Sequence, residues 1–230
     1  MSKKKNKELQ FNGHLVLEPK LKQIAIGLIL SDATLQTQSK YKKSYRMKIQ
    51  MKANKLEFAQ KIRQEFTESW IKSAPRFFER KNSKMVEIQT LSTKSLNPLG
   101  DLFFNKPSVD PEKEKDYGGH YPKRISSNFV KEHMTSVGLA YWFMGDGSKG
   151  DWTPNEGKQI QLHTHGFSFL EVEELCKGLR ESFGLQAKTR DNKRRKIIQI
   201  SGDSFEGFLD LVTPELLECF QYRIPSPRKV

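Results

Sequence analysis

The amino-acid sequence predicts an α+β protein made of two similar halves. Apolar residues recur with the 3.6-residue period of helices in some segments and with the two-residue period of strands in others. The order helix, hairpin, helix, hairpin, helix is found twice, so each half reads αββαββα. The first helix of each half ends in an aspartate, Asp32 or Asp146. A repeat of this length indicates pseudo-twofold symmetry, as in a dimer fused into one chain.

The first half is predicted to span residues 19–105 and to open with a central helix. Pro19 suits the first turn, and apolar residues from Leu21 to Ile29 follow the i, i+3, i+4, i+7 spacing. The helix is apolar nearly all round at its end, which places it in the interior.

Two hairpins and two further helices complete this half. Residues 45–52 alternate between apolar and polar side chains and are expected to pair with the weaker alternation at 34–40. A helix over 54–72 follows, with Asn54 as its N-cap. A second hairpin is predicted to turn at 81–84, and a short helix to cover 97–104.

The second half is assigned to residues 125–230, after a linker at 106–124 that is rich in Pro, Gly and charge. Its first helix is expected to start at Thr135 or Ser136 and to lead into a strand at 158–166. The next helix carries a capping signal. Ser168 is the expected N-cap with Glu171 three residues later, and Gly184 is the expected C-cap. A hairpin over 186–201 and a helix over 204–220 follow.

The composition limits the functional class. Forty Lys and Arg against 27 Asp and Glu give a net charge of +13, which favours a polyanionic partner, most often nucleic acid. No apolar run approaches the ~18 residues of a membrane span, and the basic start lacks the apolar core of a secretory signal, so an intracellular protein is expected.

Residues 1–18 are predicted to be a basic arm that either solubilises the chain or contacts phosphate. Cys176 and Cys219 lack CxxC spacing, which excludes a disulfide framework and a cysteine-based zinc site.

Each repeat-opening helix ends in an apolar run followed by its acid, AIGLILSDA at 25–33 and LAYWFMGDG at 139–147. The pair resembles the two signature motifs of the LAGLIDADG homing endonucleases. The second copy keeps the motif letters at Leu139, Ala140, Asp146 and Gly147. The first keeps Gly27 and Asp32 and departs, through apolar or small residues, at Ala25, Leu30 and Ala33.

The resemblance covers about residues 20–225. Within the family, the chain most resembles the single-chain subgroup encoded by group I introns of fungal mitochondria and algal organelles. It implies a monomer whose two curved antiparallel sheets form a basic DNA-binding saddle. The implied activity is site-specific cleavage of double-stranded DNA at a long asymmetric target, leaving short 3′ overhangs and copying the intron. An organelle-encoded gene is expected.

The physical chemistry of the motif agrees with this activity. Gly27, Gly138 and Ala140 are small enough to let the two helices approach closely. Two carboxylates at neighbouring helix C-termini repel each other unless a cation lies between them, and Mg²⁺ suits such oxygen ligands. The alternative is that each acid merely ends its helix, but the symmetric pairing favours a shared site. The expected ligands of Mg²⁺, or of Mn²⁺ in its place, are Asp32, Asp146, Ser31 and Gly145.

Two basic residues lie where the related single-chain enzymes carry catalytic lysines. Lys123 precedes the second motif helix, and Arg223 lies near the C-terminus. The resemblance implies that both polarise the attacking water and stabilise transition-state charge. Because Arg is not deprotonated in proteins, only electrostatic and hydrogen-bonding roles remain for Arg223. The alternative for both is a phosphate-positioning or surface base.

The polar faces of the predicted strands carry residues that suit the edges of bases in the major groove, Arg and Lys for guanine and Gln for adenine. Plain solvation is the alternative at each position, but positive charge on strands of both halves favours DNA binding. A zinc site at His163 and His165 lacks an evident third ligand. The predicted DNA-binding residues are Gln36, Gln38, Arg46, Lys48, Gln50, Lys52, Gln159, Gln161, His163, Lys188, Arg190, Lys193, Arg194 and Arg195.

Two other functions are compatible with such a chain. One is a maturase that binds intron RNA and assists splicing through the same basic surface. The other is a non-catalytic DNA-binding regulator on the same fold, which would be expected to lack the acids and to carry an additional helix-turn-helix domain. Since Asp32 and Asp146 are both present, we rank the regulator last.

Overall fold

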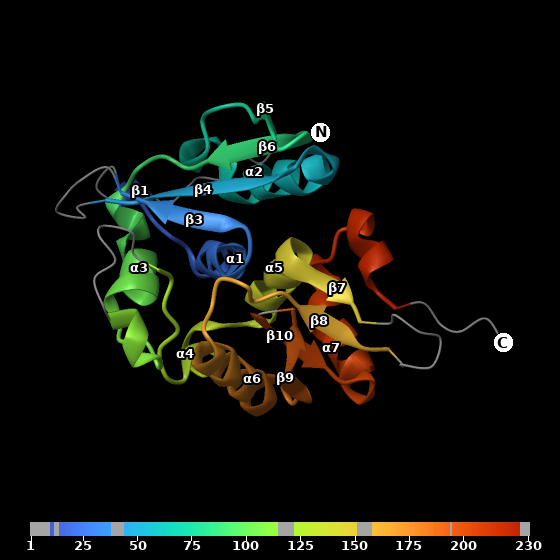
Figure 1. Ribbon diagram of the computed structural model, residues 1–230. Coiled ribbons are helices and arrows are strands. Elements are labelled where there is room, and N and C mark those ends of the chain that lie inside the picture. Colours follow the sequence, from blue (N-terminus) through green and yellow to red (C-terminus); the bar gives the residue numbers. More distant parts are fainter. Residues whose placement is uncertain are drawn as a thin grey trace.

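Two four-stranded antiparallel sheets form the framework of the described part of the chain in the computed structural model (Figure 1). The structure describes residues 10–11, 14–37, 44–114, 122–150, 158–193 and 195–225. The first sheet has the order β3-β4-β6-β5 and the second the order β7-β8-β10-β9. The strands are β3 (Ala33–Gln36), β4 (Arg46–Lys52), β5 (Arg76–Arg80), β6 (Ser83–Gln89), β7 (Gly147–Lys149), β8 (Ile160–Leu162), β9 (Ala187–Asn192) and β10 (Arg195–Ile200). The identical strand order confirms the predicted pair of α+β halves.

The helices lie between and behind the sheets. In the centre α1 and α5 lie side by side, α2 packs against β6, and α6 packs against β9 and β10 (Figure 1). Two short strands, β1 (Gln10–Phe11) and β2 (His14–Leu15), pair with each other within the predicted arm. The helices are α1 (Pro19–Leu30), α2 (Leu56–Trp70), α3 (Asn97–Gly100), α4 (Phe129–His133), α5 (Ser136–Asp146), α6 (Phe169–Phe183) and α7 (Phe205–Val212). Short 3₁₀ or π turns are η1 (Ala53–Lys55), η2 (Lys94–Leu96), η3 (Asp101–Asn105), η4 (Pro111–Glu114), η5 (Gly202–Ser204), η6 (Thr213–Glu215) and η7 (Glu218–Arg223).

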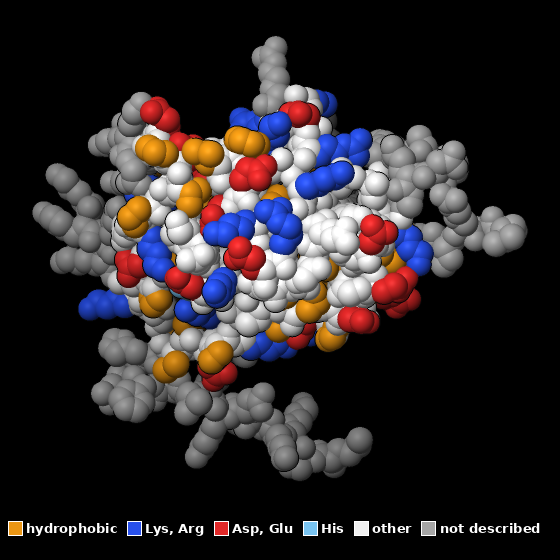
Figure 2. Space-filling model, turned by 90° about the horizontal axis from the view of Figure 1, so that it is seen from below, with side chains coloured by type: hydrophobic (Ala, Val, Ile, Leu, Met, Phe, Trp, Pro, Cys, Tyr) orange, Lys and Arg blue, Asp and Glu red, His pale blue; other side chains and the backbone are white. Residues whose placement is uncertain are grey.

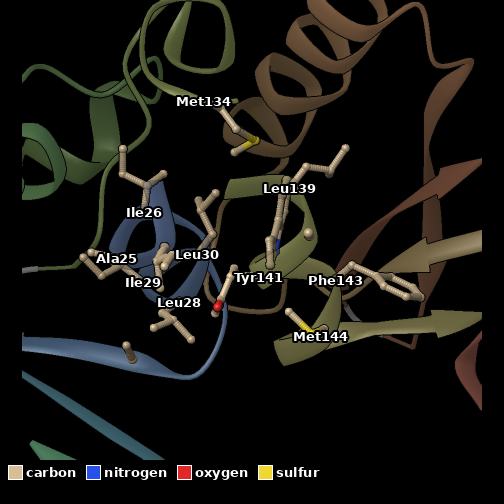
Figure 3. Packing of buried hydrophobic residues seen from close by; sticks show 14 of the residues in the cluster. Ala25, Ile26, Leu28, Ile29, Leu30, Met134, Leu139, Tyr141, Phe143 and Met144 are labelled. Carbon is tan, nitrogen blue, oxygen red and sulfur yellow. The ribbon is translucent and has the colours of Figure 1, made fainter. Parts of the chain in front are cut away.

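Close contact of the α1 and α5 backbones positions everything that follows. A Cβ atom on Gly27 would lie 2.2 Å from the carbonyl oxygen of Gly138, so only glycine fits there without a shift of the backbone. Every residue from Ile24 to Leu30 is buried, which confirms the predicted central helix. Leu30 and Tyr141 lie in the space between the two helices (Figure 3).

The predicted caps of α6 are confirmed. The backbone N–H of Glu171 donates to Ser168 Oγ, and Glu171 Oε2 accepts from the N–H of Ser168. Gly184 ends the helix in the left-handed region with φ 67°. Glu171 is fully buried. Its other carboxylate oxygen accepts hydrogen bonds from Ser108 Oγ and from the backbone N–H of Ile125, which compensate the carboxylate for the loss of water. This carboxylate therefore ties α6 to both sides of the 106–124 segment.

Two local predictions were wrong. Asn54 does not cap α2, because the chain leaves β4 through the turn η1 and Lys55 occupies the N-cap position. The second hairpin turns at Lys81 and Asn82 rather than over 81–84. Both residues have positive φ, as a tight two-residue turn requires, and β6 already begins at Ser83.

In the residues that the structure describes, none of the helices has the length and apolar character needed to cross a membrane.

Candidate active site

The C-terminal ends of α1 and α5 bring the two predicted acids to the same place. Ser31 and Gly145, the residues that precede the two acids, are in close contact. A Cβ atom added to Gly145 would lie 2.1 Å from Ser31 Oγ. Burial, and then the negative charge of Asp32, raise the pKa of Asp146 to about 6. The two carboxylates therefore sense each other's charge, as expected for acids at the joined ends of two helices.

A lysine that the sequence analysis missed lies between the two halves. Lys55 Nζ is 3.4 Å from Asp32 Oδ2 and donates at 2.9 Å to the carbonyl oxygen of Gly145. The η1 turn places this lysine, and no local pattern in the sequence marks it. The ammonium thus contacts a carboxylate of the first half and a helix-end carbonyl of the second.

Lys123 and Arg223 occupy equivalent positions at the two helix ends. Lys123 Nζ donates to the carbonyl oxygen of Ile29 and, at 3.4 Å, to that of Ser31. Arg223 Nη1 donates to the carbonyl oxygens at the end of α5, at 3.1 Å to Phe143, 3.0 Å to Met144 and 3.2 Å to Gly145. Both cations donate to carbonyls at or just beyond the end of their helix, where the helix dipole is negative. The Phe143 carbonyl also accepts from the backbone N–H of Gly147. The structure thus places both residues at the helix ends that carry the acids, and their catalytic roles stay predictions.

A surface hollow of about 400 Å³ opens beside Asp146. Exposed Tyr222 and half-buried His163 form part of its wall, together with Lys55 and Arg223. The His163 backbone N–H donates to the Asp146 carbonyl, and its Nε2 lies 3.1 Å from the hydroxyl of Ser148. Burial, followed by the charges of His165 and Arg223, lowers the pKa of His163, so the ring is neutral at neutral pH.

On the first sheet the predicted DNA-binding residues share the face opposite the core. Strand register pairs Gln36 with Arg46, and places Gln50 beside Glu87. Glu87 was not predicted. It accepts from Gln50 at 2.6 Å and forms an ion pair with Lys48 at 2.9 Å. Burial alone would raise the pKa of Glu87, but these two partners lower it. Lys52 lies exposed further along the same strand, and Gln38 lies outside the described residues.

On the second sheet Gln161, Lys188 and Arg190 also share one face, because Gln161 and Lys188 both pair with Gln199. Gln161, which was predicted to bind DNA, is buried. Its side chain is 3% exposed, since β8 is an inner strand and Gly150 lies against the amide. Gln159 bonds to Gln199.

The hairpin of β9 and β10 keeps its basic residues near the surface. Lys188, Lys193 and Arg195 are exposed, Lys193 lies in the turn with φ 58°, and Arg195 donates to the carbonyl of His165. Arg194 lies outside the described residues. By contrast, the face seen from below the view of Figure 1 carries Lys or Arg and Asp or Glu side by side (Figure 2).

Comparison with known proteins identifies the family. The model of the LAGLIDADG DNA endonuclease family matches residues 22–208, most of the chain. The chain belongs to this family. It is 34% identical over 137 residues, 60% of its own length and 90% of the relative's, to the "Probable intron-encoded DNA endonuclease 3" of Mycosarcoma maydis. It is 30% identical over 205 residues, 86% of this chain and 81% of the relative, to the "Probable intron-encoded endonuclease 1" of Wickerhamomyces canadensis.

A solved structure has the same architecture. The homing endonuclease I-WcaI, bound to its DNA recognition sequence, superimposes with a TM-score of 0.79 at 28% identity, covering 94% of this chain and 91% of that one. As a member of the LAGLIDADG family, this chain has its two motif acids at the shared helix interface. Among the described residues, no group of three His, Cys, Asp or Glu side chains could hold a metal. A cation between Asp32 and Asp146 would therefore also use backbone carbonyls such as those of Ser31 and Gly145.

Proposed function

We propose that this chain cuts both strands of double-stranded DNA at a long asymmetric target, with a divalent cation between Asp32 and Asp146. One observation carries the proposal. The two acids follow Ser31 and Gly145, which lie in close contact, and one ammonium, that of Lys55, reaches both the Asp32 carboxylate and the Gly145 carbonyl. The names of the relatives and the DNA complex of I-WcaI support DNA as the substrate.

The donor set fits Mg²⁺ or Mn²⁺, both hard cations that prefer oxygen ligands. When bound, the cation would activate water and neutralise charge on the phosphodiester. Asp32 and Asp146 would hold it. Lys123 and Arg223, fixed at the two helix ends, would supply positive charge on either side of the acids.

The two outer sheet faces would position the DNA. We expect exposed Lys52 and Lys188 and half-buried Arg190 to contact phosphates or base edges. Because both halves belong to one chain, a monomer would supply both sites of cleavage. We further propose that the gene is intron-borne, as the names of the relatives say of those proteins, and organellar.

A strand-cleavage assay on a plasmid library of candidate targets with Mg²⁺ tests this function. Asp146→Asn should abolish cutting of both strands while DNA binding stays nearly intact, because it removes one carboxylate of the shared site. Asp210→Asn is the matched control, since Asp210 is an exposed aspartate on α7. An Asp146→Asn variant that cuts at the wild-type rate would refute the proposed mechanism.

A further inference from the structure

The carbonyl oxygen of Gly145 already has two donors. Lys55 Nζ donates to it at 2.9 Å and Arg223 Nη1 at 3.2 Å. A carbonyl oxygen has two lone pairs, so both are in use. A metal ion that takes this oxygen as a ligand must displace one of the two donors.

Arg223 is the anchored donor. It is 9% exposed, its Nη1 also donates to the carbonyls of Phe143 and Met144, and its guanidinium lies 4.9 Å from the centre of the Phe220 ring. Moving it would break its hydrogen bonds to three helix-end carbonyls, bonds that are costly to lose in a buried place.

Lys55 is the displaceable donor. Its ammonium is held by one carboxylate oxygen and one carbonyl, on a flexible four-carbon stem, and it borders the open hollow beside Asp146. Its two contacts, the Asp32 carboxylate and the Gly145 carbonyl, are also two of the oxygens expected to bind a divalent cation. The ammonium therefore occupies a position that suits the cation.

We propose that Lys55 is an internal competitor for the divalent metal: in the DNA-free protein its ammonium bridges Asp32 and Gly145, and the metal binds by displacing it. This inference rests on the proposed function. Release of Lys55 requires a new acceptor for its charge, and a phosphate of bound DNA supplies one. Metal and DNA binding are then positively coupled through this side chain.

Titration of the free protein with Mn²⁺, followed by the electron paramagnetic resonance signal of unbound Mn²⁺, tests the proposal without any cleavage. Lys55→Met should bind Mn²⁺ about tenfold more tightly than wild type or better, because the competing charge is gone. Lys55→Arg, which keeps a cation, should retain weak binding, and Lys55→Gln gives a second neutral variant. Lys72→Met removes an equal charge from an exposed residue beyond α2 and should leave Mn²⁺ affinity unchanged.

Equal Mn²⁺ affinity in wild type and both neutral variants, including undetectable binding in all of them, would overturn the proposal. So would weaker binding in the neutral variants. Failure of the metal site itself would look different. In that case Asp32→Asn and Asp146→Asn would leave Mn²⁺ binding unchanged in the Lys55→Met background. A further check is the coupling between ligands, since target DNA should raise Mn²⁺ affinity more in wild type than in Lys55→Met.

Discussion

The ends of α1 and α5 differ in both backbone and electrostatics. Helix α1 ends at Leu30, two residues before Asp32, whereas Asp146 is the last residue of α5. At the end of α1, Lys123 contacts the carbonyls and Asp32 forms an ion pair with Lys55. At the end of α5, buried Arg223 contacts three carbonyls, and burial raises the pKa of Asp146 to about 6. A repeated motif therefore does not impose repeated charge. Two DNA strands cut at this site would meet two different environments.

The largest expected effect of this difference is on the rates for the two strands. If each cation acts at one phosphate, Lys123→Met and Arg223→Met should each slow one strand by about 10²–10³-fold and the other much less. Because the two strands are cut at unequal rates, a nicked intermediate should accumulate. Arg223→Lys should cut the strand served by residue 223 at the wild-type rate or faster. Time courses with each strand end-labelled measure this.

Equal slowing of both strands by either methionine variant would instead assign these residues to folding or binding. Thermal denaturation is the control, because Arg223 also satisfies carbonyls at the end of α5.

The contact of the two helices gives the next effect. Gly27→Ala should destabilise the protein by about 2–3 kcal/mol, because the new Cβ would lie 2.2 Å from the backbone oxygen of Gly138. Gly138→Ala should cost less, since its Cβ would meet the side-chain oxygen of Gln23 at 3.0 Å. Urea unfolding of both variants compares them. A larger loss for Gly138→Ala would mean that the helices are packed differently.

The buried acid should make stability depend on pH. Because the pKa of Asp146 is raised from 3.8 to about 6, the folded state binds more protons between these values, and stability falls as pH rises through that window. Asp146→Asn removes this loss, so its stability relative to wild type should rise by about 1–3 kcal/mol from pH 4 to pH 7. Asp32→Asn should weaken the pH dependence by removing a neighbouring charge. Thermal melts in EDTA measure both, with Asp210→Asn as control.

The smallest effect concerns the DNA-facing sheets. Glu87→Gln should strengthen DNA binding modestly at low salt, because it releases Lys48 and Gln50 and removes a negative charge. Lys188→Gln should weaken binding and reduce the salt slope by about one between about 50 and 200 mM. Filter binding across this salt range measures both slopes. Weaker binding by Glu87→Gln would show that the ion pair orders this face for DNA.

The sequence by itself predicted the features that arise locally. Helical period and caps predicted α1 and α6, because turns, capping boxes and apolar stripes depend on residues within a few positions. The repeat and the two motifs predicted that Asp32 and Asp146 end paired helices, and the small residue Gly27 predicted their close approach. The roles of the site residues stay predictions.

Only the tertiary structure decided which charges surround the acids. The pair of strands β3 and β4 separates Lys55, in the turn η1, from Asp32, yet its ammonium reaches the carbonyl at the end of a helix from the other half. Glu87 holds Lys48, and Gln161 is buried within its sheet although its alternation is that of an exposed face. These outcomes depend on long-range strand register and helix packing. Whether a lysine side chain is a solvated charge, an ion-pair partner or a competitor for a metal depends on neighbours that are distant in the chain.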